Sequence, residues 1–246
     1  PGNASLFLHY VQREVRMVNY HAQSLKNQIY TIIKKRLLDQ KYQDGHLLSE
    51  RTLADELRVS RTPVREALLR LQKEGWVRYI PQKGIIVKSL DAKNLTNIFQ
   101  IRTALEVLSV QLACSHITSE QLEILRLSVE QQRKLAEYDS PKYQEFIFSD
   151  TEFHNTIIEA SGNSLLRYVV EELRDNIKRT GINSLYSRTS RVAEAANEHA
   201  AIAAALERHS AEEAEIAMRH HLHICYTSAY SYIVRPKIKE SDSLHG

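Results

Sequence analysis

The stretch from residue 91 to residue 233 constrains the fold more than any other part of the sequence. It contains only two glycines, Gly162 and Gly181, and one proline, Pro141. Its apolar residues recur at spacings of three and four, the period of helices that bury one face. The pattern predicts six helices, over residues 91–115, 118–138, 141–160, 163–181, 187–208 and 210–233. Long helices with short connections favour an antiparallel all-α bundle.

The part of the chain before this stretch changes from a helical to a strand pattern. Residues 25–37 carry apolar residues at helical spacing, Ser49 precedes a short helix, and a third helix is predicted from Arg61 to Lys73. The β-branched and aromatic runs 76–80 and 85–88 flank a turn and predict a small hairpin. Three helices followed by a hairpin are typical of a winged helix-turn-helix, so the chain is predicted to be mainly α.

These patterns also predict the domain boundaries. The winged helix-turn-helix is expected over residues 20–89 and the bundle over residues 90–234. Residues 1–19 show no clear period and are interpreted as an N-terminal arm or an expression remnant. Residues 235–246 are interpreted as a flexible tail.

Composition and charge narrow the class of protein. The chain is 43% hydrophobic and 26% charged, which is ordinary for a globular protein. No apolar run approaches the roughly 18–20 residues of a membrane span. The first stretch lacks a long apolar core and a small-residue cleavage site, so no secretory signal is expected. Cys114 and Cys225 lie far apart, which favours reduced thiols in a cytoplasmic protein.

Charge is divided unevenly between the two parts. Residues 17–89 hold 14 basic and 7 acidic side chains, whereas residues 90–235 hold 15 and 20. The first part therefore has a net charge of +7 and the second one of −5. A basic first domain is the part expected to meet a polyanion such as DNA.

Side chains suited to DNA contact gather where the third predicted helix begins. They are Arg51, Ser60, Arg61, Thr62 and Arg65. This end of a recognition helix presents side chains to base edges and phosphates. Arginine binds guanine bidentately, while hydroxyls and free helix amides suit phosphate oxygens. A solvated basic helix face is the alternative interpretation.

The hairpin tip adds Lys83 and Gly84, which are expected to reach the DNA backbone or minor groove. The segments 60–68, 74–77 and 81–84 together resemble the N-terminal domain of GntR-type bacterial transcription regulators, over residues 24–88. The resemblance implies that Arg51, Arg61, Arg65 and Gly84 match operator-contacting positions. Ser60 and Thr62 lie beside them.

Four polar residues fall on or beside the apolar faces of three predicted bundle helices. Asp150 and His154 lie four residues apart on the third helix, His199 lies on the fifth and His221 on the sixth. A buried carboxylate and three buried imidazoles need partners. A divalent metal (Zn, Ni, Mn or Fe) bound by all four provides them. Taken singly, each histidine is better explained as a satisfied core or surface residue.

The bundle resembles the FCD ligand-binding domain of the FadR/VanR branch of GntR regulators, over roughly residues 91–230. The resemblance rests on the segments 101–106, 150–154, 161–163, 198–199 and 217–222. In that family an aspartate and three histidines hold a divalent metal at the floor of an effector cavity. The resemblance implies those roles for Asp150, His154, His199 and His221.

Arg102 interrupts the apolar face of the first bundle helix. A buried guanidinium needs a bidentate acid as its partner. That acid is either a bundle carboxylate, such as Glu106 of a neighbouring protomer or Asp150, or the carboxylate of a small effector that also completes the metal shell. The resemblance favours the effector.

The sequence thus predicts a regulator rather than an enzyme. A homodimer would bind a double-stranded palindromic operator, and a small carboxylic acid near the metal would change its affinity for DNA. The resemblance implies a repressor released by its ligand. One alternative is a metal-dependent enzyme fused to a DNA-binding domain, although no His-Glu-x-x-His or paired Glu-x-x-His motif is present. Another is a regulator whose metal is purely structural or is itself the signal.

Overall fold

The computed structural model describes residues 25–39, 41–81, 83–138 and 142–235. They fall into two units that divide between Leu90 and Asp91. The expected arm lies outside the described residues, and so does the expected tail apart from Arg235. No helix of the described residues is long and apolar enough to cross a membrane.

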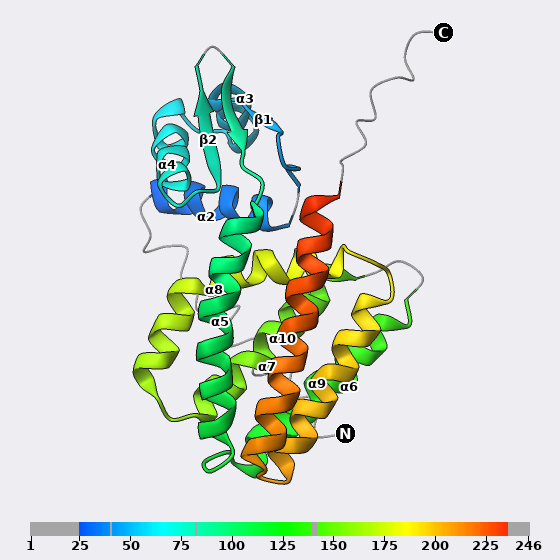
Figure 1. Cartoon of the computed structure of the whole chain (residues 1–246). Helices are drawn as coiled ribbons and strands as arrows, with labels where there is room; N and C mark the ends of the chain where they lie inside the picture. Colours follow the sequence, from blue (N-terminus) through cyan, green and yellow to red (C-terminus); the bar gives the residue numbers. More distant parts are fainter. Residues whose placement is uncertain (1–24, 40, 82, 139–141, 236–246) are drawn as a thin grey trace, which may run out of the picture. The chain divides into compact units, whose positions relative to one another are not determined.

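Among the described residues, the first unit contains three helices and a small sheet (Figure 1). Its elements are α2 (Leu25–Leu38), β1 (Leu47–Leu48), α3 (Glu50–Leu57), α4 (Arg61–Lys73), β2 (Val77–Ile80) and β3 (Gly84–Val87). The strands are antiparallel in the order β1-β3-β2, with Val77 opposite Val87 and Leu48 opposite Ile85. The predicted winged helix-turn-helix is confirmed, and β1 adds a strand that was not predicted.

Local sequence explains the turn between α3 and α4. Ser49 caps α3 by accepting a hydrogen bond from the amide of Thr52, as expected for a serine before a helix. Arg58 ends the helix in the left-handed conformation with φ 53°. The apolar faces of α3 and α4 pack into the first unit's own core, which includes Ile33 and Leu71.

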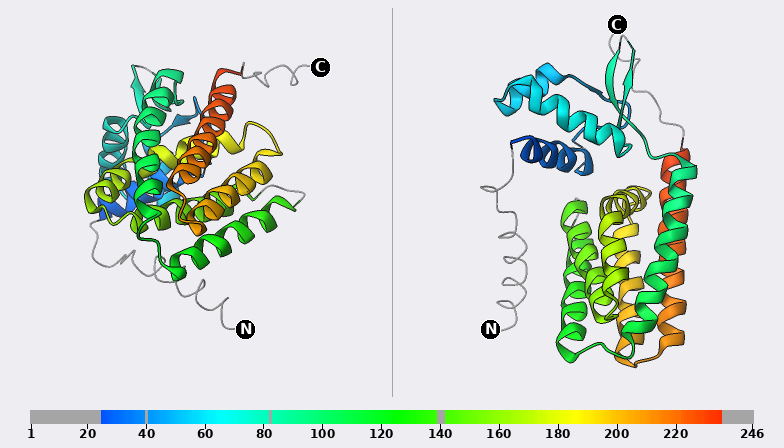
Figure 2. Two further views of the ribbon diagram at one scale, coloured as in Figure 1. Left: turned by 60° about the horizontal axis from the view of Figure 1, so that its bottom comes forward. Right: turned by 90° about the vertical axis from the view of Figure 1, so that its left-hand side faces the viewer.

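The second unit is an all-α bundle, as predicted. The six helices of its described residues are shown in Figures 1 and 2. They are α5 (Ala92–Ala113), α6 (Ser119–Ala136), α7 (Tyr143–Ala160), α8 (Ser164–Leu185), α9 (Arg191–Glu207) and α10 (Ala211–Val234).

The predicted break between the fourth and fifth helices is wrong. The fourth helix was expected to end at residue 181, but α8 continues through Gly181 to Leu185, and α9 begins at Arg191 rather than at residue 187. A Cβ added to Gly181 would lie 3.0 Å from Cδ1 of Ile147 on α7. Glycine therefore allows α7 and α8 to pack closely here and does not end the helix.

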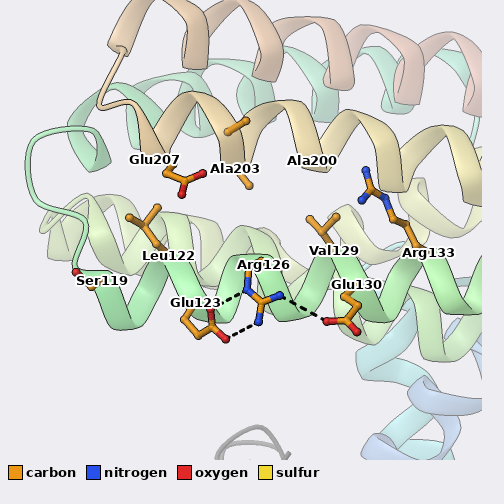
Figure 3. Close-up of a pocket in the computed structure, with 11 residues that line it drawn as sticks. Ser119, Leu122, Glu123, Arg126, Val129, Glu130, Arg133, Ala200, Ala203 and Glu207 are labelled. Carbon is orange, nitrogen blue, oxygen red and sulfur yellow. Dashed lines mark hydrogen bonds and ion pairs between the residues drawn. The ribbon is translucent and has the colours of Figure 1, made fainter. Parts of the chain in front are cut away.

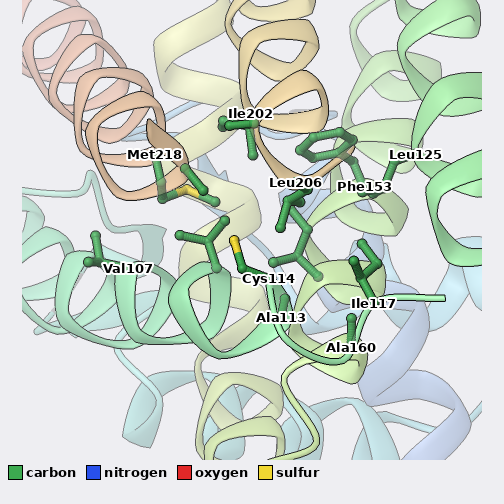
Figure 4. Packing of buried hydrophobic residues seen from close by; sticks show 14 of the residues in the cluster. Val107, Ala113, Cys114, Ile117, Leu125, Phe153, Ala160, Ile202, Leu206 and Met218 are labelled. Carbon is green, nitrogen blue, oxygen red and sulfur yellow. The ribbon is translucent and has the colours of Figure 1, made fainter. Parts of the chain in front are cut away.

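The main core of the bundle draws on α5, α6, α7, α9 and α10. Phe153, Leu206, Met218 and Cys114 are fully or almost fully buried in it (Figure 4). This cluster fixes how α7, α9 and α10 face one another, and those are the helices that carry the predicted metal ligands.

The N-terminus of α6 offers a direct test of the local sequence signals. The Thr118 side chain accepts a hydrogen bond from the amide of Gln121, whose side chain accepts one from the amide of Thr118 in return. We expect Thr118→Ala to lower the free energy of unfolding by about 1 kcal/mol, because this capping box is lost. Thr118→Ser is the control and should keep most of the stability in urea denaturation; equal losses would contradict the capping role.

Candidate functional site

The start of α4 presents a cluster of exposed polar side chains. Arg61, Thr62 and Arg65 are exposed, and Ser60 is exposed without capping the helix through its side chain. The described residues provide no ion pair for Arg61 or Arg65, while Nε of Arg51 lies 3.9 Å from Asp55. The structure therefore brings four of the predicted DNA-contacting residues to one accessible end of α4, while Arg51 is exposed in the first turn of α3.

The wing has a conformational reason for its glycine. Gly84 begins β3 opposite Ile80 and has φ +100°, a conformation that residues with a side chain rarely adopt. Lys83 is exposed beside it, and position 82 lies outside the described residues. Gly84 is thus needed by the backbone whether or not it also contacts DNA.

Inside the bundle, the four predicted metal ligands converge. One ligand atom from each of Asp150, His154, His199 and His221 can be chosen so that all four lie within 4.8 Å of one another. Oδ1 of Asp150 lies 3.6 Å from Nε2 of His199 and 3.9 Å from Nε2 of His154. The three histidines are buried, and Asp150 is partly exposed.

Each histidine is oriented by a residue that contacts its Nδ1 atom. Gln132 Oε1 lies 2.6 Å from Nδ1 of His199, and Glu198 Oε2 lies 2.8 Å from Nδ1 of His221. Nδ1 of His154 lies 2.6 Å from Oε2 of Glu106, close but without the alignment of a hydrogen bond. Outer contacts at Nδ1 leave Nε2 for a metal, which is the usual arrangement around metal-binding histidines.

Two buried arginines neutralise the negative charges of Glu106 and Glu198, the carboxylates that contact Nδ1 of His154 and of His221. Nε of Arg102 lies 2.5 Å from Oε1 of Glu106. Arg191, which is completely buried, donates to both oxygens of Glu198 at 2.8 and 2.7 Å. Each carboxylate is thereby neutralised away from the centre, and Asp150 is left as the acid facing it.

The protonation of the centre follows from these surroundings. Burial, together with the neighbouring His221 and His154, holds the pKa of His199 well below its ordinary value. Burial also lowers the pKa of His221, but its contacts with Cys225 and Glu198 outweigh this and raise the pKa overall. For Cys225, burial raises the pKa of the thiol, but His221 and the two arginines outweigh this and lower the pKa overall, to about 6.

Unsatisfied buried nitrogens are a second reason, besides the residue types, to expect a divalent metal at this centre. Nε2 of His154 and Nε2 of His199 are buried and have no hydrogen-bond partner among the described residues. Leaving two such acceptors unsatisfied is costly. A shared cation bound at both Nε2 atoms and at Asp150 removes that cost.

Arg102 is the predicted effector contact, and the structure places it beside the centre. It is 2% exposed and pairs with Glu106 one turn along the same helix. Only its Nε atom makes a hydrogen bond to the described residues. The partner is therefore a bundle carboxylate, one of the two alternatives left open, but it is Glu106 of the same chain and not Glu106 of a neighbouring protomer. The two terminal nitrogens remain able to bind an acid.

Sequence reasoning missed most of the outer residues. Gln132, Arg191, Glu198 and Cys225 were not assigned a role, and Glu106 was considered only as a partner for Arg102. The available signal was the same one that found the ligands, because Gln132 and Arg191 are polar residues on otherwise buried helix faces.

A groove of about 580 Å³ lies elsewhere in the bundle, between α6 and α9 (Figure 3). Leu122 and Val129 are among the residues that line it. Arg126 on its rim is already paired, with Glu123 at 2.7 Å and Glu130 at 3.7 Å. None of the converging metal ligands lines this groove, so it is separate from the candidate centre.

Comparison with known proteins identifies both units. Residues 25–87 match the family model of bacterial regulatory proteins of the gntR family, and residues 97–223 match the FCD domain. The HTH-type transcriptional regulator YdhC of Bacillus subtilis (strain 168) is 32% identical over 150 residues, 61% of this chain and 66% of YdhC. The chain thus spans slightly less than two thirds of that relative.

A second relative aligns over more of its length. The HTH-type transcriptional repressor RspR of Escherichia coli (strain K12) is 28% identical over 81% of this chain and 86% of its own. These relatives carry the names of transcription regulators and not of enzymes.

Solved structures show the same fold. The E. coli McbR/YncC structure is 26% identical, covers 82% of this chain and 94% of its own, and has a TM-score of 0.66. The metal-free FCD domain of TM0439 is 22% identical, covers 58% of this chain and 96% of its own, and has a TM-score of 0.51. The chain therefore belongs to the gntR family of bacterial regulatory proteins, in the group with a C-terminal FCD domain.

Proposed function

We propose that this chain is a transcription regulator that binds a palindromic operator as a homodimer. Its affinity for DNA is set by a small carboxylic acid bound at a divalent metal in the bundle. The name of RspR supports repression as the mode of action. Two copies present two recognition helices to half-sites about one helical turn apart.

The N-terminal unit supplies the DNA-binding surface. Arg61 and Arg65 are proposed to read base edges, while Ser60, Thr62 and the first amides of α4 bind phosphate. Arg51, Lys83 and Gly84 extend the contact to the backbone and the wing. Two observations support this proposal. The six side chains named here are all exposed, Gly84 having none, and they belong to a helix-turn-helix of the gntR family.

The bundle supplies the ligand site. Asp150, His154, His199 and His221 would hold the metal, which would act as a Lewis acid toward the oxygens of the effector. Arg102 is proposed to bind the effector's carboxylate through its free terminal nitrogens. The convergence of these four ligands, with each Nδ1 contacted from outside, is the observation that carries the proposal.

A thermal-shift screen of small mono-, di- and tricarboxylates tests this function. We expect one class of acid to raise the unfolding temperature of metal-loaded protein and to have no effect after chelation. A ligand at 100 times its dissociation constant stabilises the native state by about 2.7 kcal/mol. Arg102→Lys is the matched variant, and it should retain metal while losing most of the shift, because lysine lacks the bidentate fork.

Other outcomes separate the rival functions. Stabilisation by an acid that survives chelation would indicate a structural metal. Chemical conversion of an acid by the purified protein would support an enzyme instead. No stabilising acid, together with no loss of stability on chelation, would contradict the metal-carboxylate mechanism.

A further inference from the structure

One face of α5 carries apolar side chains that the bundle leaves open to solvent. Ile101 is 51% exposed and Leu108 is 42% exposed, although the opposite face of the same helix is buried in the core. Ala104, between them, is exposed as well. Together with partly exposed residues of the same face, they define what we call the α5 stripe: Ile98, Ile101, Leu105, Leu108 and Leu112.

The spacing of the α5 stripe is typical of a helix that packs against another helix. Its members follow one another at intervals of three, four, three and four residues. This alternation averages about 3.5 residues, the repeat that keeps one seam of a helix facing a second helix. A single apolar residue on a surface needs no explanation. Several at this spacing indicate a helical partner.

α8 lies beside α5 (Figure 1) and adds apolar side chains of its own. Leu105 of the α5 stripe packs against the buried cluster that contains Leu166 and Val170 of α8. On the same helix, Leu165 is 70% exposed and Tyr168 is 62% exposed. Exposed apolar residues therefore continue beyond α5 onto the helix that borders it.

The exposed residues of α5 carry no charge after Lys93. The two other ionised residues of the helix, Arg102 and Glu106, are buried and paired with each other. Depletion of charge is typical of the centre of a protein interface. It also favours a second copy of the chain as the partner, because residues near the axis of a two-fold interface meet their own counterparts, and like charges would repel there.

The size of this surface suits a dimer. α5 has 22 residues and is about 33 Å long. With a width of about 10 Å it covers about 330 Å², and the first three turns of α8 add about 160 Å². Two copies would together bury about 1,000 Å², the smallest area expected of a specific protein–protein contact.

We propose that two copies of this chain pair through the α5 stripe, with their α5 helices side by side and parallel. This inference rests on the proposed homodimer and names its interface. α5 begins at Ala92, directly after the division between the two units. Parallel helices bring both points of attachment of the DNA-binding units to the same end of the pair, as binding to one operator requires. Antiparallel helices would separate them.

Sedimentation equilibrium of the full chain tests the surface. We expect the wild type to be a dimer and Leu108→Glu to raise its dissociation constant at least about 100-fold. The reason is that one substitution removes two leucine contacts from a two-fold interface and brings two carboxylates together. Far-ultraviolet circular dichroism should show an unchanged helical content.

Ile216 provides the matched control. It is 62% exposed on α10, but residues one turn away, such as Glu212 and Arg219, are exposed and charged. Ile216→Glu makes the same kind of change outside the α5 stripe, so it should leave the dissociation constant of the dimer unchanged.

Cysteine cross-linking tests the parallel arrangement. In a parallel pair residue 101 lies opposite its own counterpart, so Ile101→Cys should form an intermolecular disulfide under mild oxidation. In an antiparallel pair residue 101 lies opposite residue 108, and only a mixture of Ile101→Cys and Leu108→Cys would cross-link. Ala201→Cys, at an exposed alanine of α9, is the control and should not cross-link. The wild type should not either, because Cys114 and Cys225 are buried.

The outcomes separate the interface from the function. A dimer that Leu108→Glu leaves unchanged would overturn the role of the α5 stripe and leave the proposed homodimer intact. Cross-linking in the mixture alone would overturn the parallel arrangement. A wild-type chain that stays monomeric, both free and on selected operator DNA, would overturn the homodimer together with the inference and would assign the stripe to a different partner.

Discussion

Replacing Arg191 with leucine is expected to destabilise the helical bundle by about 3–5 kcal/mol, because it leaves a buried carboxylate without its cation. Arg191 is 0% exposed, and it donates to both oxygens of Glu198, whose side chain is 10% exposed. Glu198 also accepts from His221, so the loss should spread to the candidate centre. Urea denaturation followed by far-ultraviolet circular dichroism measures the change.

The chain contains its own internal reference for this measurement. Its single tryptophan, Trp76, is buried in the first unit, so tryptophan fluorescence follows that unit while most of the helical signal comes from the bundle. We expect the fluorescence transition of the Arg191→Leu variant to stay near that of the wild type.

Two variants serve as controls for the buried pair. Arg126→Leu removes an exposed ion pair with Glu123 and should leave the urea midpoint close to that of the wild type. Adding Glu198→Gln to Arg191→Leu removes the stranded charge but keeps an oxygen for His221, so it should recover part of the loss. If Arg191→Leu cost no more than Arg126→Leu, the pair would not be stabilising the bundle.

Removing both arginines at the start of α4 should weaken operator binding by about 10²- to 10⁴-fold. This follows if Arg61 and Arg65 each contribute the roughly 1–3 kcal/mol of a bidentate base contact. Sites selected from random DNA by the wild-type protein provide the operator. The dissociation constant of Arg61→Ala/Arg65→Ala should then approach that for unselected DNA.

Salt dependence separates base contacts from phosphate contacts. Lys83→Ala should weaken selected and unselected DNA alike and reduce the slope of log affinity against log salt by about 1. Lys73→Ala, at the opposite end of α4, is the matched control and should alter affinity only about two- to threefold. An operator affinity independent of salt would contradict the proposed phosphate contacts.

The strongest local signals in the sequence predicted most of the fold. Ser49, Asp91, Thr118 and Ser210 each cap a helix that was expected to begin there. The errors arose where tertiary packing decided the outcome. Gly181 suggested the end of a helix because its close contact with Ile147 is not visible in the sequence. The strand β1 has only two residues, too few to show alternation.

The candidate centre was predictable only in part, for a similar reason. Helical periodicity identifies residues that face inward, and it placed Asp150 and the three histidines on buried or partly buried faces. Periodicity does not indicate which helices are neighbours, or how far one helix is shifted along its axis relative to the next. The pairing of Gln132 with His199 joins residues 67 positions apart, and this depends on the packing of α6 against α9.

The contact between His154 and Glu106 has a mechanical consequence, because Glu106 belongs to the first helix of the bundle. That helix, α5, begins at Ala92, directly after the division between the two units, and is continuous to Ala113. Glu106 is fourteen residues from this start, about 21 Å along a stiff rod. A tilt of about 5° at Glu106 displaces the start of the rod by about 2 Å. If a ligand at the centre tilted α5 in this way, the length of the helix would convert a small adjustment at one imidazole into a displacement comparable to a covalent bond length at the point where the DNA-binding unit is tethered.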